Sequence, residues 1–95
     1  MIIIREVFEF EWDQGNKEKN LNKHKVTDEE CEEVFFDPMK KISRDTLHTN
    51  QEKRYLVLGK TKKDRLLFIV FTIRKNKMRI ISARDLNKKE KYLYE

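Results

Sequence analysis

The sequence predicts an α+β fold in one domain over residues 1–95, with a single antiparallel sheet, two helices in the N-terminal half and a C-terminal helix. Three features of the sequence carry this prediction. An alternating apolar run opens the chain, two helix-capping patterns follow it, and apolar runs separated by short polar turns fill the second half. Because short turns join strands as hairpins, we expect the later strands to pair antiparallel.

The first predicted element is a strand over residues 2–11. Apolar residues such as Phe8 and Phe10 fall on one parity, while Glu9 and Glu11 fall on the other. Since successive side chains of a strand point to opposite faces, this alternation indicates one buried face and one solvated face.

Two helices are expected next. Asp13 can cap a polar helix over residues 14–24, and Thr27-Asp28-Glu29-Glu30 is a capping box that opens a second helix, which Asp37-Pro38 ends. Cys31 has apolar neighbours at helical spacing, so we expect it to pack in the core. As the only cysteine it forms no internal disulfide, which favours a reducing compartment.

The rest of the chain is typical of strands joined by turns and closed by a helix. The predicted elements are an extended segment over 39–50, a short strand over 54–59, a polar turn over 60–64, a strand covered on both faces over 66–73, a basic turn over 74–77, a strand over 78–83 and a helix opened by Asn87-Lys88-Lys89-Glu90.

The composition indicates a folded protein with an uneven charge distribution. Charged residues make up 41% of the chain and hydrophobic residues 38%, a balance that can indicate disorder. The periodic apolar runs, with 6 Phe, 3 Tyr and 1 Trp to fill a core, exclude that class. Residues 1–50 carry eight Lys and Arg against twelve Asp and Glu, whereas residues 51–95 carry fourteen against five. The second half therefore predicts a surface for nucleic acid, with an ordinary solvated basic surface as the alternative.

No apolar run approaches the roughly 20 residues that a membrane helix needs. The first residues are too short an apolar run for a signal peptide. We therefore expect a cytoplasmic protein without membrane contact.

Three stretches of the sequence carry a resemblance to a known family. They are Phe10-Glu11-Trp12-Asp13 with Asn20-Leu21, Lys23-His24 and Val26; Glu33-Val34-Phe35 with Asp37-Pro38; and Arg79-Ile80-Ile81-Ser82-Ala83-Arg84 with Glu90 and Tyr92. In this order and at these spacings, from about residue 8 to residue 94, the chain resembles the BrnT toxins of type II toxin–antitoxin systems.

The resemblance implies a compact RelE-like fold and a metal-independent endoribonuclease that cleaves RNA and inhibits translation. It also implies neutralisation by a BrnA-like antitoxin protein in a hetero-oligomer, with operator DNA bound only through the antitoxin. Two positions depart from the family pattern. Asn16 stands where many members carry Lys, so the role of that Lys is not transferred, and Cys31 stands where a small residue is usual.

Cleavage of RNA without a metal requires a group that moves a proton and cations that offset charge on the phosphate. His24 is the first candidate for general acid or base, because histidine is the side chain that ordinarily titrates near neutral pH. A structural role, holding its helix on the sheet, is the alternative. Arg74 and Arg79 flank one predicted turn, and guanidinium groups bind phosphate oxygens bidentately. Tyr92 and Tyr94 are two residues apart on the last helix, so we expect one to pack and the other to stack on a base or provide a polar end, whereas the other histidine, His48, is expected at the surface.

These considerations give two groups of predicted site residues. The predicted catalytic residues are Arg74, Arg79, His24 and Tyr92, and the predicted RNA-binding residues are Lys23, Arg54, Arg84 and Lys77. For each arginine taken alone, the alternative is an ion pair with Glu52, Asp85 or Glu90. No metal or cofactor is expected, since two distant histidines and one cysteine match no ligand spacing and no Gly-rich phosphate loop is present.

A second function remains open at the level of sequence. It is a catalytically inactive RelE-fold binding module that acts through its complex with the antitoxin and represses the operon. A sequence-specific DNA-binding protein is disfavoured, because no predicted helix is both basic and placed as a recognition helix.

Overall fold

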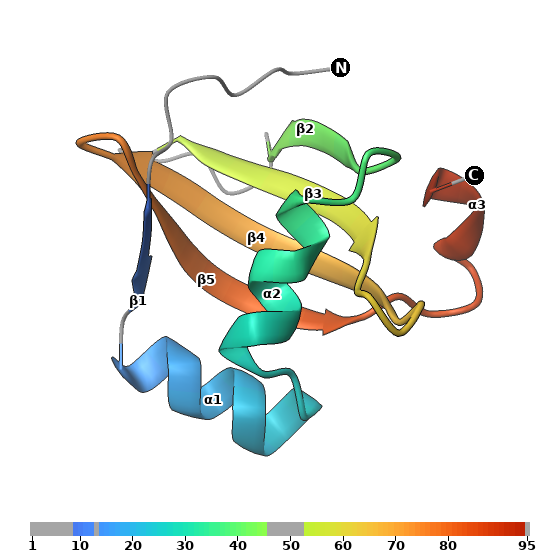
Figure 1. Ribbon diagram of the computed structural model, residues 1–95, viewed down its shortest axis with the longest axis horizontal. Coiled ribbons are helices and arrows are strands. Elements are labelled where there is room, and N and C mark those ends of the chain that lie inside the picture. Colours follow the sequence, from blue (N-terminus) through green and yellow to red (C-terminus); the bar gives the residue numbers. More distant parts are fainter. Residues whose placement is uncertain (1–8, 13, 46–52, 95) are drawn as a thin grey trace.

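The computed structural model describes residues 9–12, 14–45 and 53–94, which form one five-stranded sheet and three helices (Figure 1). The elements are β1 (Glu9–Trp12), α1 (Gln14–His24), α2 (Asp28–Phe35), β2 (Lys41–Asp45), β3 (Arg54–Lys60), β4 (Leu66–Arg74), β5 (Lys77–Asp85) and α3 (Lys91–Tyr94). The strand order is β1-β5-β4-β3-β2. The mixed α+β fold predicted from sequence is therefore confirmed. Residues 2–8, the cap at Asp13, residues 46–50, His48 and Glu52 lie outside the described residues.

One strand pair corrects the prediction of a purely antiparallel sheet. β1 lies beside β5 and runs parallel to it, with Glu9 opposite Lys77 and Trp12 opposite Ile80. The three other pairs are antiparallel. The reason for the error is that alternation in β1 defines its buried face but not its neighbour. β1 and β5 are separated by most of the chain, so no short turn sets their direction.

The hydrophobic core lies between one face of the sheet and the two longer helices. Figure 1 shows α1 and α2 on the same side of the sheet, with α3 at its edge. Phe71 and Ile80 of the sheet and Val34 of α2 are 0% exposed. The ring of Phe35 packs edge-on to that of Phe71, with their centroids 5.1 Å apart. Cys31 is also buried, as predicted, and this packing holds α2 on the centre of the sheet.

The opposite face of the sheet, here called the open face, is covered by neither α1 nor α2. Alternation along β4 puts Leu67, Ile69 and Phe71 on the helix side, and Phe68 and Val70 on the open face. Phe68 and Val70 are half-buried. The prediction of a strand covered on both faces is thus correct for the helix side and overstated for the open face.

A buried asparagine of α1, Asn20, attaches the helix to β5 of the sheet. The side chain of Asn20 is buried, and its Oδ1 accepts a hydrogen bond from the backbone N–H of Ala83 at 3.1 Å. β1 pairs with β5 only as far as Ile80, so this amide meets a strand edge that β1 no longer covers. An exposed strand edge has unpaired backbone groups, and Asn20 satisfies one of them.

Candidate nucleic-acid interface

A tight turn brings cations from β4 and β5 together on the open face. Lys75 and Asn76 form this turn with φ angles of 49° and 64°, the left-handed conformation that two-residue hairpin turns require. Arg74 and Lys77 are directly opposite each other at its base. The basic turn predicted over residues 74–77 is therefore present, and it fixes the positions of both side chains.

Two further arginines lie at the next level of the same face. Arg79 is opposite Thr72, and so is a diagonal neighbour of Arg74, a relation in which side chains are about 7 Å apart. Arg54 precedes Tyr55, the residue opposite Phe71, so it lies at the level of Thr72. We call four of the cations of this region the basic corner: Arg54, Arg74, Lys77 and Arg79.

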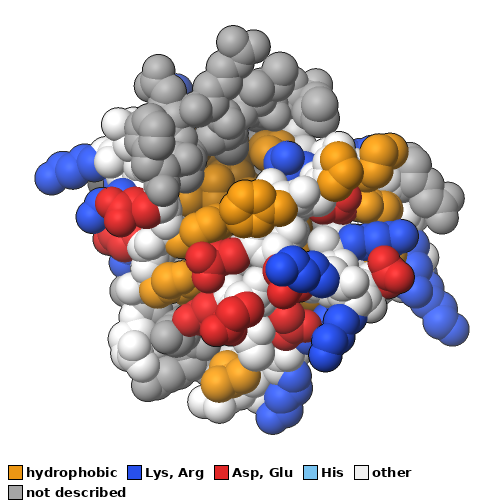
Figure 2. Space-filling view, in the orientation of Figure 1, with side chains coloured by type: hydrophobic (Ala, Val, Ile, Leu, Met, Phe, Trp, Pro, Cys, Tyr) orange, Lys and Arg blue, Asp and Glu red, His pale blue; other side chains and the backbone are white. Residues whose placement is uncertain are grey.

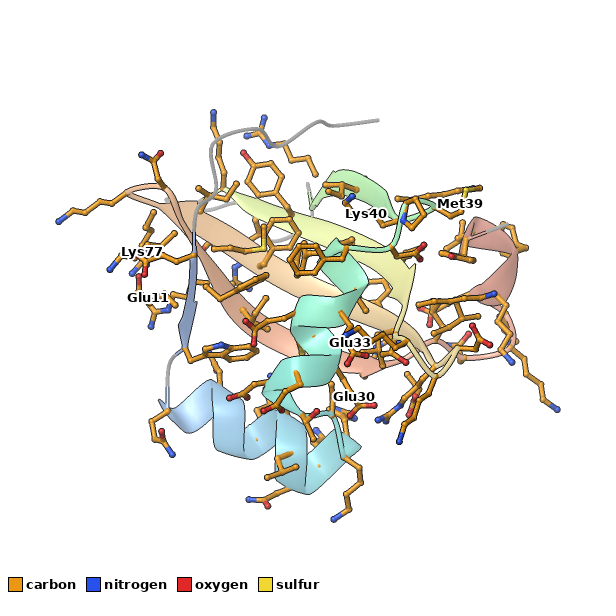
Figure 3. All side chains as sticks on the ribbon, viewed as in Figure 1. Glu11, Glu30, Glu33, Met39, Lys40 and Lys77 are labelled. Atoms are coloured by element: carbon orange, nitrogen blue, oxygen red, sulfur yellow. The ribbon has the colours of Figure 1, made fainter. Side chains whose placement is uncertain are left out.

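Two carboxylates of β1 border the basic corner. Glu9 and Glu11 are opposite Lys77 and Arg79, respectively, and the Lys77 Nζ lies 3.5 Å from Glu9 Oε1. Figure 3 shows Glu11 and Lys77 on neighbouring strands at this side of the molecule. The arrangement can bind phosphate oxygens through guanidinium groups and offers a carboxylate that can accept a proton.

His24 and Lys23 are not brought to the basic corner. His24 ends α1, and its carbonyl oxygen accepts a hydrogen bond from Arg65 Nη2 at 3.0 Å, while the same guanidinium binds Asp85. Asp85 follows Arg79 by six residues on β5, which corresponds to roughly 20 Å along the strand. His24 therefore lies at the far end of β5, where its backbone carbonyl accepts the hydrogen bond from Arg65.

Arg65 is the main residue that sequence reasoning missed. Its Nε and Nη2 donate to the two carboxylate oxygens of Asp85, and its Nη1 donates to Glu30 Oε2 at 2.9 Å and to the carbonyl oxygen of Lys25 at 2.8 Å. The hydrogen bonds that Arg65 donates to Asp85 hold the pKa of Asp85 below its ordinary value, and the same bonds raise the pKa of Arg65. The available signal was a lone Arg directly after a turn, with capping carboxylates elsewhere, but its partners are too far away in sequence to identify.

Arg84 is engaged in a structural contact. Its Nη1 and Nη2 donate to the two carboxylate oxygens of Glu90 at 2.7 and 2.8 Å, and its guanidinium lies 4.3 Å from the ring centroid of Phe68. The hydrogen bond from Arg84 lowers the pKa of Glu90 to about 2. Glu90 also exchanges hydrogen bonds with Asn87, as the capping pattern predicted. The ion-pair alternative is thus observed for Arg84, with Glu90 as partner.

The two tyrosines of α3 face different directions. Tyr94 donates a hydrogen bond from its hydroxyl to Asp37 Oδ2 at 2.6 Å, whereas Tyr92 is 70% exposed. Burial, aided by Asp37, raises the pKa of Tyr94 to about 12. Since α3 follows the Asp85 end of β5, Tyr92 lies beyond that end of the strand, whereas the basic corner is at the other end.

The part of the chain that the structure describes holds no group of three or more His, Cys, Asp or Glu side chains placed to bind a metal ion. Within the same residues, no helix is long and apolar enough to cross a membrane.

Comparison with known proteins identifies the family of the chain and a solved structure with a similar fold. Residues 12–90 match the family model described as "Ribonuclease toxin, BrnT, of type II toxin-antitoxin system". The fold is similar to the crystal structure of the Brucella abortus ribonuclease toxin BrnT, with a TM-score of 0.65 and 16% sequence identity over 86% of this chain and 100% of that chain. No curated protein sequence matches. Because the family model spans most of the sequence, the chain belongs to the BrnT family of ribonuclease toxins of type II toxin–antitoxin systems.

Proposed function

We propose that this protein is a metal-independent endoribonuclease that cleaves RNA at the basic corner and thereby inhibits translation. The observation that supports this function best is the set of four cations on one end of the open face, around the turn between β4 and β5. The proposal keeps the relation to RelE-like ribonucleases. It also places the toxin in the cytoplasm, in a hetero-oligomer with a BrnA-like antitoxin that neutralises it and through which alone operator DNA is bound.

The chemistry assigned to the basic corner divides into two parts. Arg74 and Arg79 bind the scissile phosphate and offset the charge that develops on it, while Arg54 and Lys77 hold neighbouring phosphates. Glu11 lies beside Arg79 and is our candidate for the group that accepts the proton of the attacking 2′-hydroxyl. It takes this role in place of His24. Lys23, Arg84 and Tyr92 remain proposals for contacts with the rest of a long RNA, since they lie away from the corner.

One observation favours the alternative, an inactive binding module. The described histidine, His24, lies at the other end of β5, so within the described residues the corner has no imidazole to move a proton. Cations and carboxylates in one patch can also bind RNA without cleaving it. Cleavage by the purified protein separates these two functions.

The decisive experiment is cleavage of a structured RNA in EDTA by the wild type and by an Arg74→Ala/Arg79→Ala variant. We expect loss of roughly 100-fold or more in the variant, since removing one charge-stabilising donor commonly costs that much. A Lys88→Ala/Lys89→Ala variant removes the same charge from exposed positions outside the corner, and it should cleave normally. If both variants are folded and lose cleavage equally, the result would count against the assigned site. A folded wild type that cleaves no RNA would instead support the inactive binding module.

Two single substitutions test the assignment of the proton acceptor. Glu11→Gln should reduce the cleavage rate by roughly 10²-fold or more, whereas His24→Gln should leave the rate of the folded protein nearly unchanged. The opposite result would return the chemistry to the histidine.

Salt dependence tests the electrostatic part independently of cleavage. If each of the four cations neutralises one phosphate of a single strand, the plot of log affinity against log salt has a slope of roughly −2.8, and roughly −1.4 in the Arg74→Ala/Arg79→Ala variant. A flat response in the wild type would contradict the charge-based account even if RNA binding persisted.

A further inference from the structure

A cleft of opposite charge lies on the helix side of the molecule, at the end of β4 remote from the basic corner. Its lining comes from α2, from the segment that follows α2 and from the turn between β3 and β4. The residues that line it are Glu29, Glu32, Glu33, Phe36, Asp37, Pro38, Lys60, Thr61, Lys62 and Asp64, and we call it the acidic cleft. β4 spans nine residues from Leu66, beside the cleft, to Arg74, a distance of roughly 25 Å.

The apolar part of the cleft is exposed although its backbone is firmly held. Phe36 is 79% exposed, and Met39, just beyond the cleft, is 64% exposed. Between them, Asp37 accepts hydrogen bonds from the backbone N–H groups of Met39 and Lys60 and from the Tyr94 hydroxyl. Burial opposes the charge on Asp37, but these hydrogen bonds keep its pKa below the ordinary value. The wall is thus a fixed feature that presents large apolar side chains to solvent.

Close packing of α2 on β3 fixes the other wall. A Cβ on Gly59 would lie 2.7 Å from Val34 Cγ1 and 3.3 Å from Asp37 Oδ2, so only glycine lets the helix approach this closely. The backbone N–H of Lys62 donates to Glu33 Oε1 at 3.0 Å and ties the β3–β4 turn to the helix. The cleft therefore exists before any partner binds, which lowers the ordering cost of binding.

The charge of the cleft defines what can occupy it. Glu32 and Glu33 follow Glu29 by three and four residues on α2, so both are neighbours of Glu29 on the helix surface, an arrangement of like charges that disfavours a helix by itself. Burial, together with repulsion from Asp28 and Glu29, raises the pKa of Glu32. In Figure 2 acidic side chains gather on this face of the molecule, with hydrophobic side chains beside them. The five carboxylates of the lining outnumber its two lysines, Lys60 and Lys62, so the cleft has a net negative charge that repels RNA and attracts a cationic protein segment.

We propose that the acidic cleft is a docking site for a basic, amphipathic segment of the antitoxin. Lysine or arginine side chains of that segment pair with the carboxylates of Glu29 and Glu32, and an apolar anchor packs against Phe36 and Pro38. This inference rests on the proposed partnership with an antitoxin. It adds that the partner holds the toxin at a surface remote from the RNA-binding cations.

A second copy of the chain fits the cleft less well. Its own cations could enter the cleft of a neighbour, but a head-to-tail contact between two different surfaces of the same chain joins molecules into rings or open chains. Such a contact would also occupy the cations needed for RNA. A separate protein meets neither problem.

The test measures affinity for the purified cognate antitoxin, taken from the gene beside that of the toxin, by titration calorimetry. Phe36→Ser/Glu32→Lys should weaken binding roughly 30-fold or more, the effect of removing an interface hot spot. The matched control is Leu21→Ser, which removes an apolar side chain that is 48% exposed on α1, and it should bind like the wild type. RNA cleavage by the free Phe36→Ser/Glu32→Lys variant should equal that of the wild type, since neither residue belongs to the basic corner.

The possible outcomes separate the docking site from the proposed function. Normal antitoxin affinity in the Phe36→Ser/Glu32→Lys variant would overturn the docking site while leaving the antitoxin partnership intact. A wild type that binds no antitoxin would overturn both the partnership and the docking site. Light scattering of the toxin alone tests whether a second copy of the chain occupies the cleft. Self-association that the Phe36→Ser/Glu32→Lys variant abolishes would assign the cleft to a second copy and overturn the proposal.

Discussion

Replacing Arg65 with alanine should destabilise the protein more than any other substitution of an exposed or half-buried charge in the described residues. The guanidinium uses all five of its N–H donors, towards the carboxylates of Asp85 and Glu30 and the carbonyl oxygens of His24 and Lys25. It thereby joins the end of α1, the capping box of α2 and the end of β5. Arg65→Ala leaves four acceptors without their donor.

The magnitude follows from the exposure of each partner. Arg65 and Glu30 side chains are each 26% exposed, while that of Asp85 is 58% exposed. The bond to Glu30 and those to the two carbonyl groups are each worth about 1 kcal/mol net, and the more exposed Asp85 pair adds almost nothing because solvent screens it. The total is about 3 kcal/mol, a large part of the 5–15 kcal/mol or so that holds a domain folded. For a domain of this size it lowers Tm by roughly 12–24 °C.

Urea denaturation followed by circular dichroism measures this loss. Arg65→Lys should recover only part of it, because an ammonium cannot reproduce the planar fork of donors. Lys63→Ala, at an exposed position in the preceding turn, is the control and should change stability by less than about 0.5 kcal/mol. A loss below about 1 kcal/mol in Arg65→Ala would refute the idea that one guanidinium joins the three elements.

The pH dependence of the same difference has a definite sign. Arg65 hydrogen bonds lower the pKa of Asp85, and those from Thr27 and Arg65 lower the pKa of Glu30 against the effect of burial. Because both pKa values are lower in the folded state, the two carboxylates stabilise the fold at any pH above their ordinary pKa values of 3.8 and 4.5. This stabilisation is lost as the pH falls through the folded-state pKa values. The difference in free energy of unfolding between the wild type and Arg65→Ala should therefore be largest at pH 7 and become smaller below about pH 4. A difference that grows in acid would contradict the assignment.

Three further predictions concern single side chains. Gly59→Ala should cost about 1–3 kcal/mol in urea denaturation, because the new methyl group meets Val34 Cγ1 at 2.7 Å; an unchanged midpoint would mean that α2 does not pack on β3 as described. The Cys31 thiol should react with a thiol reagent at pH 8 only as fast as the protein opens, because burial raises its pKa to about 12; rapid stoichiometric labelling of the native protein would disprove this. Glu90→Gln should lower the free energy of unfolding by about 1 kcal/mol at pH 7, because it removes the ion pair with Arg84. The hydrogen bond from Arg84 lowers the pKa of Glu90 to about 2, so the contribution of the pair is lost as the pH falls from 4.5 towards 2. Denaturation curves that show the same loss of stability at pH 2 would exclude the ion pair as its source.

Local signals in the sequence predicted the elements whose causes are local. The capping box at Thr27 forms with reciprocal bonds to Glu30 at 3.0 and 3.2 Å, and the two-residue turn at Lys75 and Asn76 sets the register of β4 and β5. Both features depend on residues within four positions of one another. For the same reason the prediction that Arg74 and Arg79 lie close together follows from one turn and holds in the register of the sheet.

Long-range contacts account for what the sequence did not reveal. The parallel pairing of β1 with β5 joins residues nearly 70 positions apart, such as Glu9 and Lys77, and no local pattern encodes such a neighbour. Arg65 reaches carbonyl oxygens about 40 residues away, and backbone acceptors have no sequence signature. These two contacts also decide which residues lie at the basic corner. The first brings Glu11 to the basic corner and the second keeps His24 away from it.

The uneven charge of the two halves of the sequence acquires a spatial meaning in the fold. Acidic residues of the first half gather on α2, while cations of the second half gather at the turn between β4 and β5, roughly 25 Å away along β4. A compact protein with net charge +5 could have mixed these charges and gained surface ion pairs. Such pairs contribute little to stability, so separating most of the charges costs little, and each cluster keeps a net charge of one sign. A fold that keeps the two fields apart can bind RNA at one end and a cationic protein segment at the other without competition between them.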